Sequence, residues 1–519
     1  MDSFKIIANP FLITCDPQDR GGRLSLLIRN DRIAGVAERA DLLKDLHPEA
    51  AVIDASNKLV IPGFVNAHFH SESIALRPQT DNLHYALWET NPVIREWTRE
   101  FLDPLSKDHI RNIYLMTYFS HLKSGTTCVG EYGLPLGGKE FAQALHAIER
   151  TEVKTASSLQ NWEQIQMAEE WKGGPHCFFV NAGKEEEFTV YSFENLLRAA
   201  KELNVPLLAH VAEQRAGAEL IRKTFQTGIL AVLQNFGILQ PQTVLVHLNH
   251  LGNKEAGVLA GMGCTVVVCA RSAAFKRTGY PFLRYLSREH IRLAVGTDWG
   301  NVDMLEELRF LLRLHLLISG IPPLSPLQLV RMGTINGASA LGLSHETGSI
   351  EVGKKADLTF YSLDDLRVPR AAETAGAEDL ASLLLNHLTN RDVSDVMING
   401  DFYVAKGQVM TMAEEEILDL FGSAVARLSR GADSPAPQAD FSGPPPKILP
   451  FTSGSRNAQA PGEGFELGFH VAEPPPAGKA DQEKPQAHVS PIAGAKEEAN
   501  RPPGEKPKEV WRTFGEEDF

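Results

Sequence analysis

Two histidines separated by a single residue, His68 and His70, directly follow an apolar stretch of the chain. In an extended strand, side chains two residues apart point to the same side, so both imidazoles can reach one metal ion. Such a pair is a weak signal on its own, because an isolated buried histidine usually has a structural role. The pair predicts metal chemistry only if further ligands come from other parts of the chain.

Three more residues that can bind a metal, His210, His247 and Asp298, each stand at the end of another apolar run. Taken singly, each is explained by a core histidine with satisfied hydrogen bonds or by an aspartate that caps a helix. A whole set of strand ends that carry imidazoles and a carboxylate points instead to a shared metal ion. If three of these imidazoles and the aspartate bind the ion, a coordination position is left for water, which is typical of a catalytic metal site.

The elements that must position these residues alternate between buried strands and helix-like segments from residue 59 to residue 345. Leu59–Val65 is a continuous apolar run, which indicates the first fully buried strand of a parallel sheet. The other predicted strands are residues 126–129, 153–157, 177–180, 206–209, 244–246, 264–269 and 291–295. Strands separated by helices in this way predict a (β/α)8 barrel of the TIM type, in which catalytic groups gather at the carboxyl ends of the strands. An open doubly wound sheet is disfavoured, because no glycine-rich phosphate turn follows the first strand.

Short strand-like segments flank this barrel in the sequence. Residues 1–58 and 346–412 combine short apolar runs with turns, and we expect them to pair in one small composite β-sandwich domain. A helix is predicted at residues 413–430. Residues 431–519 are rich in Pro and polar residues and poor in apolar ones, which predicts a disordered tail. The aromatic and acidic residues 510–519 fit either an ordinary solvated end or a protein-docking motif.

Charge and composition narrow the kind of partner. The formal charge of −14 disfavours nucleic acid, because phosphate contacts need clustered Lys and Arg. No apolar run is long enough to predict a membrane-spanning helix, and the N-terminus lacks the pattern of a secretory signal. The five cysteines form no CxxC pair and are interpreted as reduced thiols. We therefore expect a cytoplasmic protein that acts on a small molecule, with no nucleic acid and no membrane as partner.

Several segments, in their order and spacing, resemble the motifs of the amidohydrolase superfamily. They are Pro62–His70, Leu122–Thr127, His210–Glu213, Gly296–Asp298, Asn336–Gly342 and Gly348–Phe360. Within the superfamily, the chain is similar to the branch that holds chlorohydrolases, cytosine deaminase and the methylthioadenosine/S-adenosylhomocysteine deaminases. The resemblance spans residues 1 to 410 and implies a hydrolase with one divalent metal ion per chain, with Zn²⁺ favoured over Fe²⁺. It also implies a homodimer.

The resemblance assigns the metal ligands residue by residue. They would be His68, His70, His210 and Asp298. Asp298 would also take a proton from the water that the ion activates, since a bound cation brings the pKa of such a water towards ~7.

The resemblance assigns proton transfer and charge stabilisation to two further residues. Glu213 would act as general acid and base and carry a proton to a ring nitrogen of the substrate. His247 would steady the attacking hydroxide and the tetrahedral intermediate. His250 competes for that role, but His247 is nearer the strand end. A carbamylated lysine after the fourth strand would indicate two metals, with Lys184 as the candidate, yet the presence of Glu213 favours the one-metal pattern.

The chain departs from the pattern of this branch where the substrate pocket would be shaped. The purine deaminases usually carry Pro-His after the fourth strand, where this chain has Asn181–Gly183, and Ala270–Ala273 replaces a Pro-x-Ser-Asn-like segment. Both departures disfavour a nucleoside substrate. Three residues are candidate substrate contacts: Glu72 for an amidine or amine, Arg271 for an anionic group, and Trp299, which narrows the pocket. The alternative for Glu72 is a solvated rim residue, and for Arg271 a structural ion pair.

The hypothesis from the sequence is hydrolytic deamination of an amino-substituted nitrogen heterocycle, or of a related amidine-like compound, through metal-activated water. This chemistry belongs to hydrolases that act on carbon–nitrogen bonds other than peptide bonds. One alternative is an amidohydrolase that cleaves another C–N bond or a C–Cl bond. Another is an inactive barrel that serves as a scaffold and recruits partners through its tail, but the complete ligand set favours an enzyme.

Overall fold

The strands of the protein form three separate sheets. The computed structural model describes residues 2–429, apart from residues 81–82, 89–90, 93, 97–106, 134–135, 171–175, 184–189, 252–254, 260, 280–290, 319–323 and 370. Within this part of the chain, one sheet has eight strands, one has seven and one has four. Lys184 and the predicted tail lie outside the described residues.

The eight-stranded sheet is a parallel barrel, which confirms the predicted fold class. Its strands follow one another in sequence order: β8 (Phe64–Phe69), β9 (Thr126–Glu131), β10 (Lys154–Leu159), β11 (Cys177–Asn181), β12 (Leu207–Val211), β13 (Thr243–His247), β14 (Thr265–Val268) and β15 (Arg292–Val295). The barrel closes just beyond β15, where the Asp298 N–H donates to the His68 carbonyl at 2.9 Å and the His70 N–H donates to the Asp298 carbonyl at 3.1 Å. Backbone pairing thus brings the first and last strands together at their carboxyl ends.

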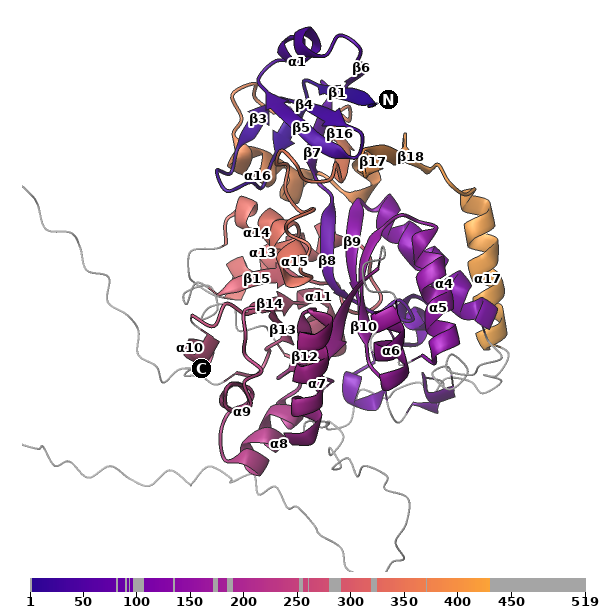
Figure 1. Cartoon of the computed structure of the whole chain (residues 1–519), viewed down its shortest axis with the longest axis vertical. Helices are drawn as coiled ribbons and strands as arrows, with labels where there is room; N and C mark the ends of the chain where they lie inside the picture. Colours follow the sequence, from indigo (N-terminus) through magenta and orange to yellow (C-terminus); the bar gives the residue numbers. More distant parts are fainter. Residues whose placement is uncertain are drawn as a thin grey trace, which may run out of the picture. The chain divides into compact units, whose positions relative to one another are not determined.

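Helices lie between successive barrel strands and after the last one, and most of them surround the barrel (Figure 1). They are α2 (Ser73–Thr80), η1 (Tyr85–Leu87), α4 (Lys107–Lys123), α5 (Gly138–Glu149), α6 (Trp162–Glu170), α7 (Val190–Leu203), α8 (Arg215–Phe225), α9 (Ile229–Asn235), α10 (Ala256–Leu259), α11 (Ala270–Lys276), α13 (Met304–Ile318), α14 (Pro326–Met332) and α15 (Ile335–Ala340). Helix α5 illustrates why they pack: Phe141, Ala144, Leu145 and Ile148 recur every three or four residues and are buried. Branched side chains such as Val65, Val246 and Val267 fill the barrel interior, so reactive groups can gather only at its mouth.

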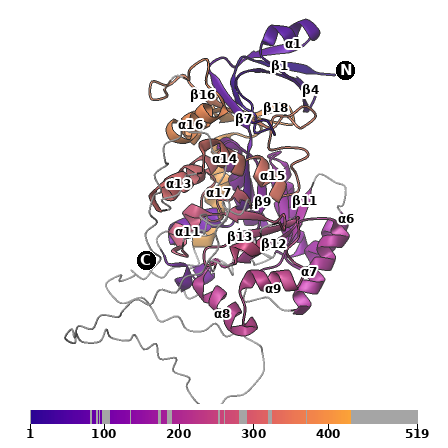
Figure 2. The same ribbon diagram turned by 90° about the vertical axis from the view of Figure 1, so that its left-hand side faces the viewer.

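The other two sheets form a β-domain built from both ends of the described chain (Figure 2). The four-stranded sheet contains β1 (Phe4–Ala8), β4 (Ser25–Arg29), β5 (Arg32–Ala37) and β6 (Ala51–Asp54), with α1 (Ala40–Leu46) beside it. The seven-stranded sheet contains β2 (Phe11–Ile13), β3 (Gly21–Arg23), β7 (Lys58–Pro62), β16 (Leu358–Ser362), β17 (Val393–Ile398), β18 (Asp401–Ala405) and β19 (Gln408–Val409). Because β7 pairs antiparallel with β16, the N- and C-terminal segments share one sheet, as predicted.

The apolar run Leu59–Val65 was predicted to be one barrel strand, and this is wrong. Its first part belongs to β7 in the β-domain, and the barrel begins only at Phe64 in β8. Gly63 separates the two strands, and a Cβ atom at this position would lie 2.1 Å from Thr127 Oγ1. Only glycine fits this close approach to β9, so the chain passes from one sheet to the other here. Every residue of the run Leu59–Val65 is buried, and hydrophobicity alone therefore does not separate the two strands.

The remaining helices pack beside these sheets. They are α16 (Ala377–His387), the short η4 (Asn390–Asp392) and α17 (Glu414–Ser429). Helix α17 runs along α4, where Asn112 Nδ2 donates to the Leu420 carbonyl at 3.2 Å and Lys123 forms an ion pair with Glu414 (Figure 1). Within the described residues, none of the helices has both the length and the apolar character needed to cross a membrane.

Candidate active site

The predicted metal ligands and their neighbours lie at the carboxyl ends of the barrel strands. These residues are His68 in β8, His70 directly after it, His210 in β12, His247 at the end of β13 and Asp298 beyond β15. His247 and Asp298 have positive φ angles of 81° and 57°. Residues other than glycine rarely adopt this backbone conformation, and such strain is concentrated at functional sites.

A glycine allows the last strand to approach the first one at this rim. A Cβ atom on Gly296 would lie 2.7 Å from the Cβ of His68, so any larger residue would push the two segments apart. The close approach brings the Asp298 carboxylate next to the two histidines of β8. Glycine at position 296 is therefore part of what builds the site.

The four predicted ligands are linked by three short contacts, in which His68 and Asp298 each contact two of the others. His68 Nε2 lies 3.2 Å from His210 Nε2, and Asp298 Oδ1 lies 3.5 Å from His68 Nε2 and 3.3 Å from His70 Nε2. Ligand atoms at ~2.1 Å from a tetrahedral ion are separated by ~3.4 Å, so these spacings fit such an ion. Two imidazole nitrogens face each other at 3.2 Å, and Asp298 Oδ1 is buried with no hydrogen-bond partner among the described residues. Imidazole and carboxylate donors of this kind suit Zn²⁺ and Fe²⁺ alike.

Glu213 and His247 border this cluster. Glu213 lies two residues beyond β12, is 4% exposed, and has its Oε2 atom 3.7 Å from His247 Nε2. The potential ligand atoms of His247, Glu213 and Asp298 all lie within 4.8 Å of one another, as do those of His247, His210 and His68. The structure therefore brings together the six residues that were predicted as ligands or catalytic groups.

Burial and mutual contacts shift the pKa values within the cluster. Burial lowers the pKa of His68 to about 4, so this imidazole is neutral, the form that binds metals. Burial alone would lower the pKa of His70, but its contacts with Asp298 and Glu72 raise it to about 9. Burial would also raise the pKa of Asp298, but the charge of Lys276 and the imidazoles hold it well below its usual range. Asp298 is accordingly an ionised carboxylate.

The sequence interpretation missed two residues that hold Asp298. Ser272 and Lys276 are four residues apart on α11 and therefore lie on the same side of that helix. Ser272 Oγ donates to Asp298 Oδ2 at 2.5 Å, and Lys276 Nζ donates to the same oxygen at 2.6 Å. Lys276 Nζ also donates to Glu213 Oε1 at 3.1 Å. A Ser and a Lys four residues apart in the helix after a barrel strand are the signal that could have found them.

The three predicted substrate contacts lie in different surroundings. Glu72 is 2% exposed and its Oε1 atom lies 3.1 Å from His70 Nδ1, so it contacts a predicted metal ligand. The Trp299 ring lies 5.6 Å from the His70 ring and 4.7 Å from the Trp88 ring, and its Nε1 donates to Thr80. Trp299 thus forms part of an aromatic wall beside the cluster.

The third predicted contact, Arg271, lies apart from the cluster. Its backbone N–H donates to Glu307 Oε1 at 3.0 Å, and within the described residues its side chain makes no hydrogen bond or ion pair with the predicted ligands. His250, the competitor of His247, has its Nε2 atom 2.6 Å from the Thr278 carbonyl and is half-buried. This hydrogen bond agrees with a structural role for His250.

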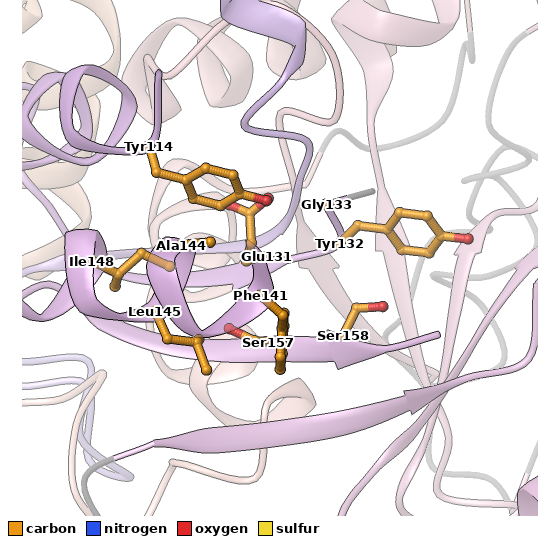
Figure 3. A pocket seen from close by; sticks show the side chains of 10 residues that line it. All are labelled: Tyr114, Glu131, Tyr132, Gly133, Phe141, Ala144, Leu145, Ile148, Ser157 and Ser158. Carbon is orange, nitrogen blue, oxygen red and sulfur yellow. The ribbon is translucent and has the colours of Figure 1, made fainter. Parts of the chain in front are cut away.

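Tyr132, which the sequence did not single out, packs against the cluster from the end of β9. Its ring centroid lies 4.4 Å from that of His210, 4.6 Å from that of His70 and 5.4 Å from that of His68. Tyr132 also borders a small pocket that lies between β9, β10 and one face of α5, and Figure 3 shows Tyr114 and Glu131 directed toward each other there. Because apolar side chains of α5 line this pocket, it is a gap between helix and barrel rather than the mouth of the site.

Comparisons with known proteins agree with this architecture. Residues 59–403 match the amidohydrolase family. The chain is 28% identical over 431 residues to the 5-methylthioadenosine/S-adenosylhomocysteine deaminase of Moorella thermoacetica, covering 79% of this chain and 96% of the relative. It is 26% identical over 444 residues to the 5'-deoxyadenosine deaminase of Methanosarcina barkeri, covering 80% and 96% of the two chains.

Solved structures share the fold at lower identity. An adenosine deaminase from Xanthomonas campestris with bound zinc superposes with a TM-score of 0.72 at 22% identity, covering 82% of this chain and 98% of that one. The atrazine chlorohydrolase of Arthrobacter aurescens, complexed with zinc, superposes with a TM-score of 0.71 at 20% identity, covering 81% and 99%. These likenesses establish a common architecture.

Proposed function

The chain belongs to the amidohydrolase family, and from that premise we propose that it is a metal-dependent hydrolase that deaminates an amino-substituted nitrogen heterocycle. The observation that carries the proposal is the chain of contacts in which His68 lies 3.2 Å from His210 and 3.5 Å from Asp298, and Asp298 lies 3.3 Å from His70. Glu213 lies beside Asp298 and His247. A set of ligands together with a separate carboxylate is what hydrolysis by activated water requires.

His68, His70, His210 and Asp298 would hold one divalent ion, and Zn²⁺ suits three imidazoles and a carboxylate. Such an ion supplies hydroxide near neutral pH, because it lowers the pKa of water from its ordinary value to ~7. The contact of the Glu72 carboxylate with His70 Nδ1 supports this assignment, since a histidine that binds a metal usually donates the N–H of its other ring nitrogen to an acceptor.

The residues around the ligands have separate tasks in the proposed reaction. Asp298, whose Oδ1 atom faces the imidazoles, also accepts the proton of the attacking water. Glu213 carries a proton to a ring nitrogen of the substrate as general acid and base, and the departing amine leaves as ammonia. His247, 3.7 Å from Glu213, donates a hydrogen bond to the oxygen on which negative charge develops.

The substrate is proposed to be an aminopurine-like or related heterocycle. Relatives of the chain are named as deaminases of methylthioadenosine, S-adenosylhomocysteine and 5'-deoxyadenosine. After β11, however, this chain continues with Ala182 and Gly183, so neither residue offers an imidazole to a ribose. Trp299, Trp88 and Tyr132 provide flat aromatic surfaces near the cluster, which suit a planar ring. We therefore favour a base without ribose over a nucleoside.

Other properties stay predictions from the sequence. These are the cytoplasmic location, the homodimer and protein docking through residues 431–519. A small-molecule substrate agrees with the activities for which the relatives are named.

The test is ammonia release by the purified, zinc-loaded protein from a panel of aminopurines, aminopyrimidines and aminotriazines, offered as free bases and as nucleosides. His210→Ala serves as the control for metal-dependent turnover. Ammonia from at least one free base, lost in the control, supports the proposal. Release of chloride or of a substituted amine, with no ammonia from any compound, would establish cleavage of another C–N or C–Cl bond instead. Zinc far below one ion per chain that added metal does not restore would favour the scaffold alternative.

A further inference from the structure

A lysine is buried inside the cluster, in direct contact with both acidic groups of the proposed reaction. Lys276 is 3% exposed, and its Nζ atom lies 2.6 Å from Asp298 Oδ2 and 3.1 Å from Glu213 Oε1. Burying an ammonium group is costly unless it is paired with an acid and hydrogen-bonded. This site satisfies both conditions, so the lysine is built into the cluster.

Lys276 contacts one oxygen of each carboxylate, and the other oxygen of each faces a histidine. Asp298 Oδ2 accepts hydrogen bonds from Lys276 and Ser272, and Asp298 Oδ1 faces His68 and His70. Glu213 Oε1 accepts a hydrogen bond from Lys276, and Glu213 Oε2 faces His247. One ammonium group therefore fixes both carboxylates by one oxygen each, and the other oxygen of each is directed at the imidazoles.

Aromatic rings surround the same ammonium group. Lys276 Nζ lies 4.9 Å from the ring centroid of Tyr85, 5.8 Å from that of Trp88 and 5.9 Å from that of Trp299. Rings at this range attract a cation and keep water away from it. The charge of Lys276 is thus held in one place and poorly screened.

We propose that Lys276 is a positioning residue that orients Glu213 and Asp298 for catalysis, and that its fixed positive charge restrains the affinity of the site for a divalent cation. This role rests on the proposed function, because it takes Asp298 as a metal ligand and Glu213 as the proton carrier. The two parts of the proposal predict opposite effects of removing the lysine on the catalytic rate and on the affinity for the metal ion. Loss of orientation lowers the rate, whereas loss of a like charge strengthens cation binding.

The first measurement is the zinc affinity of the metal-free protein, determined by competition with a chromophoric chelator. Lys276→Met should bind Zn²⁺ about tenfold or more tightly than wild type, since a poorly screened charge has been removed next to the site. Lys276→Arg keeps the charge and should bind as wild type does. Damage to the fold would weaken binding, so a gain in affinity reports the charge itself.

A matched control removes a partly buried lysine at the opposite end of the barrel. Lys154 begins β10, and its Nζ atom lies 2.7 Å from Asp357 Oδ1 and 2.9 Å from Asn399 Oδ1. Lys154→Met should lower the melting temperature without changing the zinc affinity. If Lys276→Met does not fold, Lys276→Gln removes the charge with a polar side chain and takes its place.

The second measurement is the steady-state kinetics at saturating zinc. Lys276→Met should lower kcat with little change in KM, because substrate binding is kept while the proton carriers are misplaced, and Lys276→Arg should restore part of kcat. Unchanged or weaker zinc binding in Lys276→Met, or unchanged kcat, would overturn the role of Lys276. Failure of the wild type to bind zinc more tightly than His210→Ala would instead overturn the proposed function.

Discussion

The contact between Glu72 and His70 gives a prediction that separates two roles for Glu72. Its Oε1 atom lies 3.1 Å from His70 Nδ1, and the two side chains are 3% and 13% exposed. A carboxylate there fixes the His70 ring so that Nε2 faces Asp298 and the proposed ion. We predict that Glu72→Ala weakens zinc binding while leaving KM for the substrate nearly unchanged.

The size of this effect follows from the burial of the pair. A hydrogen bond to a charged group is worth ~1.5–3 kcal/mol, and water cannot readily replace Glu72 because this residue is only 2% exposed. Loss of such an outer contact on a metal ligand typically costs about 10–100-fold in affinity, or ~1.4–2.7 kcal/mol, and the two ranges agree. Glu72→Gln keeps an oxygen acceptor without the charge and should lie between wild type and Glu72→Ala.

The surface of the protein offers a control with the same spacing. His47 Nδ1 lies 3.2 Å from Glu49 Oε1, again two residues apart, but these side chains are 30% and 55% exposed. Glu49→Ala should leave zinc affinity unchanged in the same chelator assay. If Glu72→Ala keeps the wild-type zinc affinity and raises KM, then Glu72 reads the substrate and the reasoning from the His70 contact is refuted.

Three further predictions concern the reaction, the fold and acid stability. Glu213→Gln should retain zinc but lower kcat by about 10²–10⁴-fold, and an unchanged rate would show that another group moves the proton. Gly63→Ala drives a Cβ into Thr127 and should cost ~1–3 kcal/mol in urea unfolding, which an unaltered midpoint would contradict. Burial lowers the pKa of His121 to about 3 in the folded protein. In the unfolded chain this histidine takes up a proton below pH ~6.5, whereas in the folded protein it stays neutral down to about pH 3. The stability present above pH ~6.5 is therefore lost as the pH falls, by up to ~1.4 kcal/mol per unit, and His121→Leu should reduce this slope in urea unfolding measured at roughly pH 7 and 5.

The barrel was predictable because its strands are short apolar runs whose ends carry unusual residues. His68, His210 and His247 each follow or end such a run, and parallel strands necessarily gather their carboxyl ends at one rim. The division of the first run was not predictable from hydrophobicity, since every residue from Leu59 to Val65 is buried. The close approach at Gly63 that separates them depends on Thr127, a residue of another strand.

The positioning groups of the site were harder to predict than its ligands. Lys276 reaches Glu213 and Asp298 only because α11 begins at Ala270, which sets the side of the helix that faces the cluster. A shift of one residue in that start would turn Lys276 about 100° away. Tyr132 is similar, because its contacts with the histidines arise from ring packing across strands and leave no pattern in the sequence. Ligand types are local features, whereas their supports depend on register.

The formal charge of the cluster bears on whether one or two metal ions bind. The carboxylates of Glu72, Glu213 and Asp298 contact the imidazoles, and Lys276 supplies a single ammonium group among them. When the imidazoles are neutral, as metal ligands are, three negative groups and one positive group leave two negative charges, which one divalent ion neutralises. A second divalent ion would leave an excess of two positive charges among buried side chains, where uncompensated charge is costly. The lysine is held beside Asp298, so it further opposes a second cation at that carboxylate. The charge balance therefore favours a one-metal site, and metal analysis of the zinc-loaded protein should give one ion per chain.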